Sequence, residues 1–295
     1  MADDVLFDKR PDGVALITLN RPDSLNAMGG DLMPQLAQYL SRCQHDTSVR
    51  CVVLTGAGRA FCAGGDVKSM QGGGVGANTG NGASQQSAPP EQIEAPVPAP
   101  AERRSAFSAL DPSVGMLRES QMRTSYVLHT MGKPTIAAVN GHAVGAGLSL
   151  ALACDLRIAS DKAKFGTAFR NVSLSGDFGG SYYMQRLVGM GKARELYFTA
   201  EIIQADEALR IGMVTRVVPH DDLMNETMTW ATKMASGPTA TMARTKENLN
   251  LGEYSDLRTL MDQEAFYQRL TSLTNDHREA VKAFVEKREP KFAGN

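Results

Sequence analysis

Residues 140–155 read NGHAVGAGLSLALACD, a glycine-rich loop that runs directly into an apolar helical segment. Gly145 and Gly147 let other atoms approach the backbone closely, because glycine carries no side chain. The first amides of a helix have no acceptor within the helix, and the helix dipole adds partial positive charge at the same end. The stretch therefore predicts a site for a negatively charged oxygen.

A second glycine-rich loop lies upstream, where residues 59–66 read RAFCAGGD and follow the apolar run 51–54. Two backbone amides from separate loops that converge on one oxygen form an oxyanion hole, which stabilises negative charge as it develops on a carbonyl. Each loop taken alone is equally typical of an ordinary strand-to-helix turn. The two loops together indicate carbonyl chemistry more strongly than either one does.

The composition disfavours several other functions. The 295 residues carry a formal net charge of −1 with scattered basic residues, so we expect no nucleic-acid partner. The chain has no apolar run of membrane-spanning length and no leader-like N-terminus, which predicts a cytoplasmic protein without membrane insertion. The four cysteines are interpreted as reduced core residues, and the five histidines are too dispersed for a metal site, so we expect no metal.

The pattern of apolar residues predicts an α/β fold. Short β-rich runs at 14–19, 51–54 and 135–139 alternate with helical patterns, one of them at 31–43. From about residue 179 onward helices dominate, including a segment at 205–210 and a helix that begins at Pro238. We expect a core over residues 1–200 and a helical region over residues 201–295.

Residues 71–113 differ sharply in composition from the rest of the chain. They are rich in Gly, Pro, Ala, Ser and Gln, and such a stretch has too little apolar surface to order itself. Two interpretations stay open, a plain flexible loop and a mobile flap over a binding pocket. The next segment, 114–131, has helical spacing and should pack beside the site.

The order of the motifs resembles the crotonase (enoyl-CoA hydratase/isomerase) superfamily over nearly the whole chain. The matching segments are RPDSLNAM at 21–28, VVLTGAGRAFCAGGDV at 52–67, KPTIAAVNGHAVGAGLSLALACDLRIAS at 133–160, and RLVGMGKARELYFTAEIIQADEALRIGMVTRVV at 186–218. The resemblance implies a crotonase-type spiral of repeated ββα units with a C-terminal helical region. It also implies a coenzyme A thioester as substrate, no redox cofactor, and a homotrimer or dimer of trimers.

The resemblance assigns roles to individual residues of this sequence. The oxyanion-hole amides fall on Ala63 and Ala146. The segments that would contact the substrate are Asn26, Ala27 and Met28, then Gly64, Gly65, Asp66 and Val67, and finally Gly145, Ser149 and Phe169. A closing helix at 280–292 matches the family as well, with Phe284 and Lys287 near a neighbouring subunit, or with Phe284 and Val285 turned inward as an ordinary amphipathic helix would turn them.

The chain departs from the family pattern at the acid and base residues. Hydratases of the superfamily carry glutamates at the positions that Ser149 and Phe169 occupy here, and neither replacement can shuttle a proton near neutral pH. Asp177 is the acidic residue that remains nearby, at a position where several superfamily isomerases carry a catalytic aspartate. It could act as the proton carrier, or cap the helix that follows it, or do both.

These residues favour isomerase-type proton transfer through a thioester enolate, with Asp177 as the proton carrier. A hydratase with a non-standard acid and base set is a first alternative. A non-catalytic acyl-CoA-binding protein is a second, because both glutamates are lost. Hydrolase and carbon–carbon lyase chemistry also stay open, since one fold hosts many reactions.

Overall fold

Two β-sheets form the core of the protein. The structure is a computed structural model that describes residues 3–66 and 111–295. The larger sheet has the order β1-β2-β3-β5-β7-β10, and the smaller has the order β4-β6-β8-β9. The strands are β1 Val5–Lys9, β2 Val14–Leu19, β3 Cys51–Gly56, β4 Ala60–Cys62, β5 Thr135–Val139, β6 His142–Val144, β7 Leu156–Ser160, β8 Lys164–Gly166, β9 Ile203–Gln204 and β10 Arg216–Val218.

Most strand pairs in both sheets are parallel, and only β1 with β2 and β8 with β9 run antiparallel. Parallel pairing requires crossover connections, which helices supply here. The helices are α1 Leu32–His45, α4 Pro112–Arg123, α5 Ser125–Thr130, α6 Ala146–Ala153, α7 Gly180–Thr199, α8 Ala205–Arg210, α9 Leu223–Ala235, α10 Thr239–Gly252, α11 Leu257–Ser272 and α12 Asn275–Glu286, with short 3-10 turns at Pro22–Ser24, Phe169–Val172 and His220–Asp222. The α/β fold with its helical C-terminal region is therefore as predicted.

Alternate residues of the larger sheet face two separate apolar clusters, because successive side chains of a strand point to opposite faces. Ile17 and Leu54 belong to the larger cluster, which also holds residues of α1 and α6. Val14 and Val53 belong to the smaller cluster, which residues of α9 cover. Both faces are thus buried, which explains why all six residues of β3 are buried.

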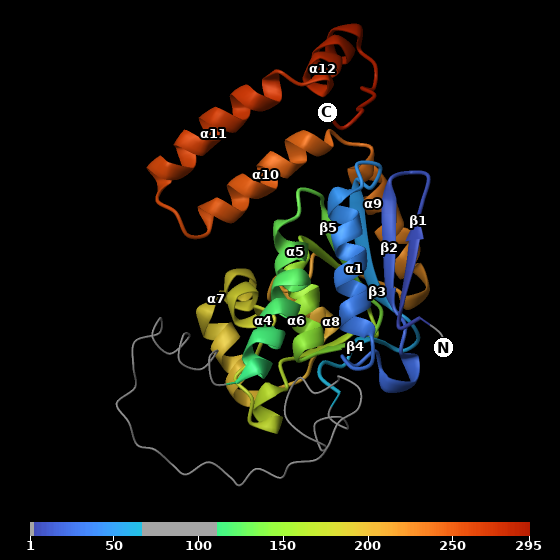
Figure 1. Cartoon of the computed structure of the whole chain (residues 1–295), viewed down its shortest axis with the longest axis vertical. Helices are drawn as coiled ribbons and strands as arrows, with labels where there is room; N and C mark the ends of the chain where they lie inside the picture. Colours follow the sequence, from blue (N-terminus) through green and yellow to red (C-terminus); the bar gives the residue numbers. More distant parts are fainter. Residues whose placement is uncertain (1–2, 67–110) are drawn as a thin grey trace.

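The last three helices, residues 239–286, form an arm that extends away from the sheets (Figure 1). The base of the arm is attached by Arg50, whose guanidinium donates to the carbonyl of Gly237 at 2.5 Å and to the hydroxyl of Thr239 at 2.9 Å. Farther along α10, Lys246 pairs with Asp155 at 2.9 Å. No residue of α11 is buried. The arm is therefore fixed to the core through α10, and α11 packs against α10 without burying any residue fully.

The sheets continue past the predicted core limit at residue 200, because β9 and β10 each complete a sheet. The predicted helix at 280–292 is partly wrong: α12 starts at Asn275 and ends at Glu286. The inward orientation of Phe284 and Val285 is also wrong, since both are strongly exposed. The side of α12 that carries them has no partner among the described residues. The insertion at 71–113 lies outside the described residues except for its last three positions.

Within the described ranges, no helix is both long enough and apolar enough to cross a membrane. The four cysteines are all free and buried, as the sequence predicted.

Candidate active site

Helix α6 begins where the sequence predicted an anion site. Gly145 precedes it with φ 55° and ψ −128°, a backbone conformation that residues with a side chain rarely adopt. Its amide donates to the carbonyl of Gly166 at 2.9 Å, so the loop is tied to β8. Ala146 is the first residue of the helix, and its amide has no intrahelical acceptor. The start of α6 therefore presents a backbone donor in a fixed place.

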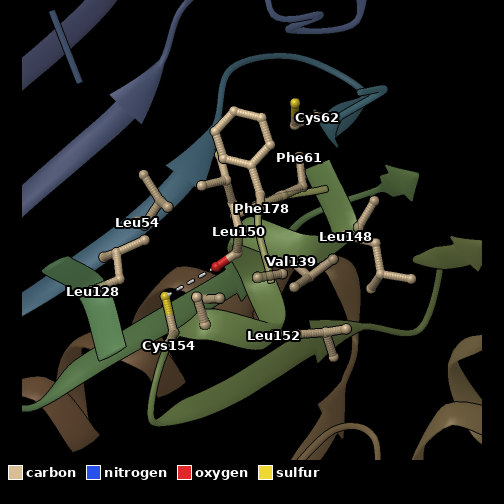
Figure 2. Close-up of a cluster of buried hydrophobic side chains, with 14 of the residues drawn as sticks. Leu54, Phe61, Cys62, Leu128, Val139, Leu148, Leu150, Leu152, Cys154 and Phe178 are labelled. Atoms are coloured by element: carbon tan, nitrogen blue, oxygen red, sulfur yellow. Dashed lines mark hydrogen bonds between the residues drawn. The ribbon is translucent and has the colours of Figure 1, made fainter. Parts of the chain in front are cut away.

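Helix α6 is enclosed by apolar side chains on all sides. All eight of its residues are buried, and the cluster around it includes Phe61 from β4, Leu128 from α5 and Phe178 (Figure 2). At its other end the buried guanidinium of Arg157 donates to the carbonyls of Leu152 at 3.3 Å and Cys154 at 2.6 Å. A cation at this end complements the helix dipole. The helix is therefore held at both termini.

The two predicted glycine loops meet at the start of α6. A methyl group built on Gly64 would lie 2.8 Å from the carbonyl oxygen of Val144 and 3.4 Å from the amide nitrogen of Ala146. A methyl group on Gly147 would overlap the carbonyl of Cys62. Only glycine fits where two backbones approach this closely.

The assignment of Ala63 as an oxyanion donor is wrong, because its amide already donates to the carbonyl of Leu25 at 3.0 Å. The Gly64 amide lies beside the sulfur of Cys62, where it lowers the pKa of that thiol against the larger effect of burial. The next amide along the loop belongs to Gly65, and the hydrogen bond at its bridge with Met28 runs from the Met28 amide to the Gly64 carbonyl at 2.7 Å, without using the Gly65 amide. Gly65 therefore replaces Ala63 as the candidate donor of this loop.

Asn26 holds the first substrate loop together through its side chain. It is fully buried, and its amide group donates to the carbonyls of Ala57 at 2.9 Å and Ala60 at 2.8 Å. Its side-chain oxygen accepts the Arg21 amide at 2.8 Å. The side chain thus has a structural role, and any substrate contact here would come from the backbone.

The rest of this loop reaches the second loop. Met28 donates from its amide to the carbonyl of Gly64 at 2.7 Å. The Arg21 guanidinium donates to the carbonyl of Ala27 at 2.7 Å and lies 3.6 Å from the carboxylate of Asp66. The structure therefore brings together the predicted residues 26–28 and 64–66. The predicted contact Val67 lies outside the described residues.

Phe169 forms an aromatic wall beside the start of α6. A methyl group built on Gly145 would lie 3.8 Å from its ring, and one built on Gly176 would lie 3.5 Å from it. The ring of Tyr197 stacks on it within 5° of parallel, with centroids 6.3 Å apart. The predicted residue Phe169 thus lies between the oxyanion loop and the segment that carries Asp177.

Asp177 has a buried side-chain oxygen, Oδ1, for which the described residues supply no hydrogen-bond partner. Burial raises the pKa of this carboxyl to about 6. The alternative that Asp177 caps α7 is wrong, because the cap residue is Gly179 and no side chain caps the helix. A buried polar atom without a partner is uncommon in proteins, and a ligand is one explanation for it.

Ser149 and Tyr197 both lie against Gly180, three residues after Asp177, and the sequence analysis missed Tyr197. The hydroxyl of Ser149 donates to the carbonyl of Gly145 at 3.3 Å, which is the local backbone bond expected of a helical serine. A methyl group on Gly180 would collide with that hydroxyl and would lie 2.7 Å from the hydroxyl of Tyr197. The irregular run Gly189–Met190–Gly191 was the signal that α7 is interrupted and could return Tyr197 to this place.

An α/β fold with a helical C-terminal region, in which two glycine loops meet at the start of a buried helix, is the arrangement expected of the crotonase class of acyl-CoA enzymes. The sequence profile of the enoyl-CoA hydratase/isomerase family matches residues 9–94 and 114–295. The chain belongs to that family.

Individual relatives agree with this conclusion. The chain is 36% identical to a short-chain-enoyl-CoA hydratase of Clostridium acetobutylicum, over 93% of this chain and 92% of that protein. It is 34% identical to the 1,2-epoxyphenylacetyl-CoA isomerase of Escherichia coli, over 96% of this chain and 95% of that protein. The crystal structure of an enoyl-CoA hydratase from Bacillus anthracis superposes with a TM-score of 0.81 at 30% identity, covering 99% of this chain and 100% of that one.

Proposed function

We propose that this protein catalyses proton transfer on an acyl-CoA thioester, with Asp177 as the proton carrier. The observation that carries the proposal is the buried, unpartnered Oδ1 of Asp177 in a carboxyl whose pKa is raised to about 6. A proton carrier works best when its pKa lies near the operating pH. Since Ser149 and Phe169 have no carboxylate, Asp177 is the group best suited to this role.

The amides of Ala146 and Gly65 would hold the thioester carbonyl oxygen. Polarising that carbonyl acidifies the adjacent carbon and stabilises the enolate, and each well-placed donor contributes on the order of 3 kcal/mol to the transition state. Asp177 would remove a proton from one carbon of the acyl chain and return it to another. This sequence of steps moves a double bond and adds no atoms, so the reaction is an isomerisation.

The same site supports the idea of coenzyme A binding through backbone contacts. The loops at 26–28 and 64–66 are held together by the Met28 to Gly64 hydrogen bond and by the bridge between Met28 and Gly65. We propose that they contact the adenine and pantetheine parts of the thioester. The proposed reaction needs no redox cofactor, since no electrons are exchanged with the substrate. We also propose that the protein acts in the cytoplasm.

A second candidate function is hydration. Relatives named as hydratases favour it, including a crotonyl-CoA hydratase of Syntrophomonas wolfei that is 32% identical over 99% of this chain. Water addition would then use Asp177 together with the hydroxyl groups near it, in place of the two glutamates. Turnover of crotonyl-CoA to a product heavier by one water would favour this candidate over isomerisation.

We also propose that the arm assembles copies of this chain into a trimer or a dimer of trimers. Exposed apolar side chains along it support the proposal, among them Leu257, Phe266 and Phe284. A monomer rarely leaves so many large apolar groups in water, and patches of this kind mark interaction surfaces.

The first test is mass spectrometry of saturated and unsaturated acyl-CoA thioesters incubated in deuterated water with the wild type and with Asp177→Asn. We expect deuterium uptake at carbon in the wild type, with no added water. We expect the variant to lose at least about a hundredfold in exchange rate while keeping its CoA affinity, because it lacks only the proton carrier. Equal exchange rates in the two proteins would contradict the proposal, and binding without exchange in either would favour a non-catalytic acyl-CoA-binding protein.

A further inference from the structure

Helix α7 is interrupted at Gly189, and the interruption changes what the helix places in the site. Gly189 has φ 79° and ψ 157°, which is non-helical. In a continuous helix, residue 197 would lie about 25 Å along the axis from residue 180. A methyl group on Gly180 would nevertheless lie 2.7 Å from the hydroxyl oxygen of Tyr197. The second half of α7 is therefore folded back, and Tyr197 returns to the start of its own helix.

Tyr197 is held firmly in this position. The hydroxyl of Thr167 donates to the carbonyl of Leu196 at 2.9 Å, and the Arg170 guanidinium donates to the carbonyl of Thr199 at 3.3 Å. The tyrosine ring stacks on Phe169. Both ring and backbone are fixed, so the hydroxyl has a defined location.

The fold of the described residues leaves the hydroxyl of Tyr197 without a hydrogen bond. This hydroxyl makes no hydrogen bond with any residue in the ranges 3–66 and 111–295, although Ser149, which is 1% exposed, packs against the same glycine. Burial and the negative charge of Asp177 raise the pKa of Tyr197 to about 12, so the phenol stays protonated at neutral pH. It can therefore donate a hydrogen bond and cannot act as a base.

Asp177 supplies the matching acceptor. Its buried Oδ1 has no partner among the described residues, and its backbone carbonyl accepts the Gly180 amide at 3.1 Å. An unpartnered donor from the end of α7 and an unpartnered acceptor from the segment before α7 are thus both held beside Gly180. A hydrocarbon chain would satisfy neither of them. An O–H group satisfies both, since its oxygen accepts from Tyr197 while its hydrogen is donated to Asp177.

We propose that Tyr197, with Ser149 beside it, forms a binding site for one O–H group next to Asp177. The O–H group is either a hydroxyl on the acyl chain of the substrate or a water molecule. The inference rests on the proposed role of Asp177 as the proton carrier, which isomerisation and hydration share, and it deepens that role by naming the chemistry that the acyl end of the site selects. Tyr197 is then a specificity-determining residue that touches the ligand directly.

The first arm of the test measures affinity and needs no turnover. Calorimetry would compare butyryl-CoA with 3-hydroxybutyryl-CoA on the wild type and on Tyr197→Phe, which keeps the stacked ring and removes only the hydroxyl. If the O–H group belongs to the acyl chain, the variant should bind 3-hydroxybutyryl-CoA about five- to tenfold more weakly and butyryl-CoA equally well. Tyr254→Phe, at a tyrosine that is 72% exposed on the arm, is the matched control and should change neither affinity.

The second arm tests water as the ligand. Crotonyl-CoA would be incubated in water labelled with oxygen-18, and the rate at which label enters the product would be followed. If the site holds water, Tyr197→Phe should slow this addition at least about tenfold while both affinities stay unchanged.

The inference is overturned if Tyr197→Phe matches the wild type in both arms, and equally if affinities are unchanged and the wild type adds no labelled water. Failure of the proposed function looks different, because it appears as proton exchange that survives Asp177→Asn. The affinity arm does not depend on that result.

Discussion

Helix α6 and the arm show two opposite ways in which this chain treats apolar surface. Every residue of α6 is buried within the same subunit, whereas α11 buries none and Phe284 of α12 is 85% exposed. The first arrangement is complete in one chain, and burial of this kind supplies most of the stability of a fold. The second leaves apolar area exposed in the single chain. The candidate chemistry therefore lies on the part of the molecule that a single chain can stabilise alone.

The core and the arm should differ most in how far a glycine-to-alanine substitution lowers the free energy of unfolding. Gly147→Ala places a methyl group onto the Cys62 carbonyl, and backbone cannot move aside as a side chain can. We expect the variant to lose about 3 kcal/mol or more of unfolding free energy. Gly252→Ala on the arm is the control, because its methyl group would meet only the Leu260 side chain at 3.3 Å. Urea unfolding followed by circular dichroism would measure both, and similar losses would contradict the contrast.

A smaller effect on the free energy of unfolding should appear at Asp177, because burying its ionised carboxyl destabilises the core. The native pKa is raised to about 6 from 3.8, so between these pH values the native state holds a proton that the unfolded state has released. Stability therefore falls as pH rises from about 4 to 6 and carries a constant penalty above that. We expect Asp177→Asn to be more stable than the wild type by about 2 kcal/mol at pH 8.

That difference between Asp177→Asn and the wild type should close as the pH falls toward 4. Unfolding in urea at a series of pH values measures it, and contributions from other groups cancel in the difference. A gap that is constant from pH 4 to pH 8 would mean that the carboxyl is not buried in the native state.

Gly189 and Gly191 offer a matched pair within α7. A methyl group on either would have no neighbour within 4 Å, so only the backbone conformation distinguishes them. Gly189→Ala should cost about 1–2 kcal/mol because of its positive φ, and Gly191→Ala should be neutral or slightly stabilising, as alanine is in a helix. Thermal melting compares the two. Equal melting temperatures would show that the reversal of α7 does not depend on this residue.

The smallest effect on the stability of a single subunit should come from the arm. Phe284→Asp alters a side chain that makes little contact with its own chain, so we expect a change within about 0.5 kcal/mol. The same change should reduce the proposed assembly to monomers, because burying an unpaired charge in an apolar interface is strongly unfavourable. Sedimentation measures the mass, and Phe284→Leu should assemble as the wild type does. A wild type that is already monomeric would remove the role proposed for the arm.

The sequence predicted the fold where local pattern and packing agree. The runs 14–19 and 135–139 match β2 and β5, and 205–210 matches α8, because each is bounded by residues that end regular structure. The prediction for α12 was poorer. An amphipathic pattern indicates that one face is apolar, but it does not indicate what covers that face, and here nothing in the described chain covers Phe284.

At the candidate site, the sequence located the loops and not the individual donors. The glycines show where two backbones approach, but the amide of Ala63 is used by Leu25, a contact between distant residues that no local pattern reveals. Tyr197 was missed for a similar reason. Its place depends on a single non-helical residue, Gly189, which redirects half a helix. Both cases concern tertiary geometry rather than the chemistry of a motif.

The four buried cysteines provide a chemical reporter that distinguishes the core from the arm. Cys43, Cys51, Cys62 and Cys154 all belong to the sheet core, and the arm contains none. Burial raises the pKa of their thiols to about 11 for Cys43 and about 12 for the other three, so almost no thiolate forms at neutral pH. Alkylating reagents attack the thiolate and need access to it. The rate of cysteine alkylation will therefore report how often the core opens, and movements of the arm will not change this rate.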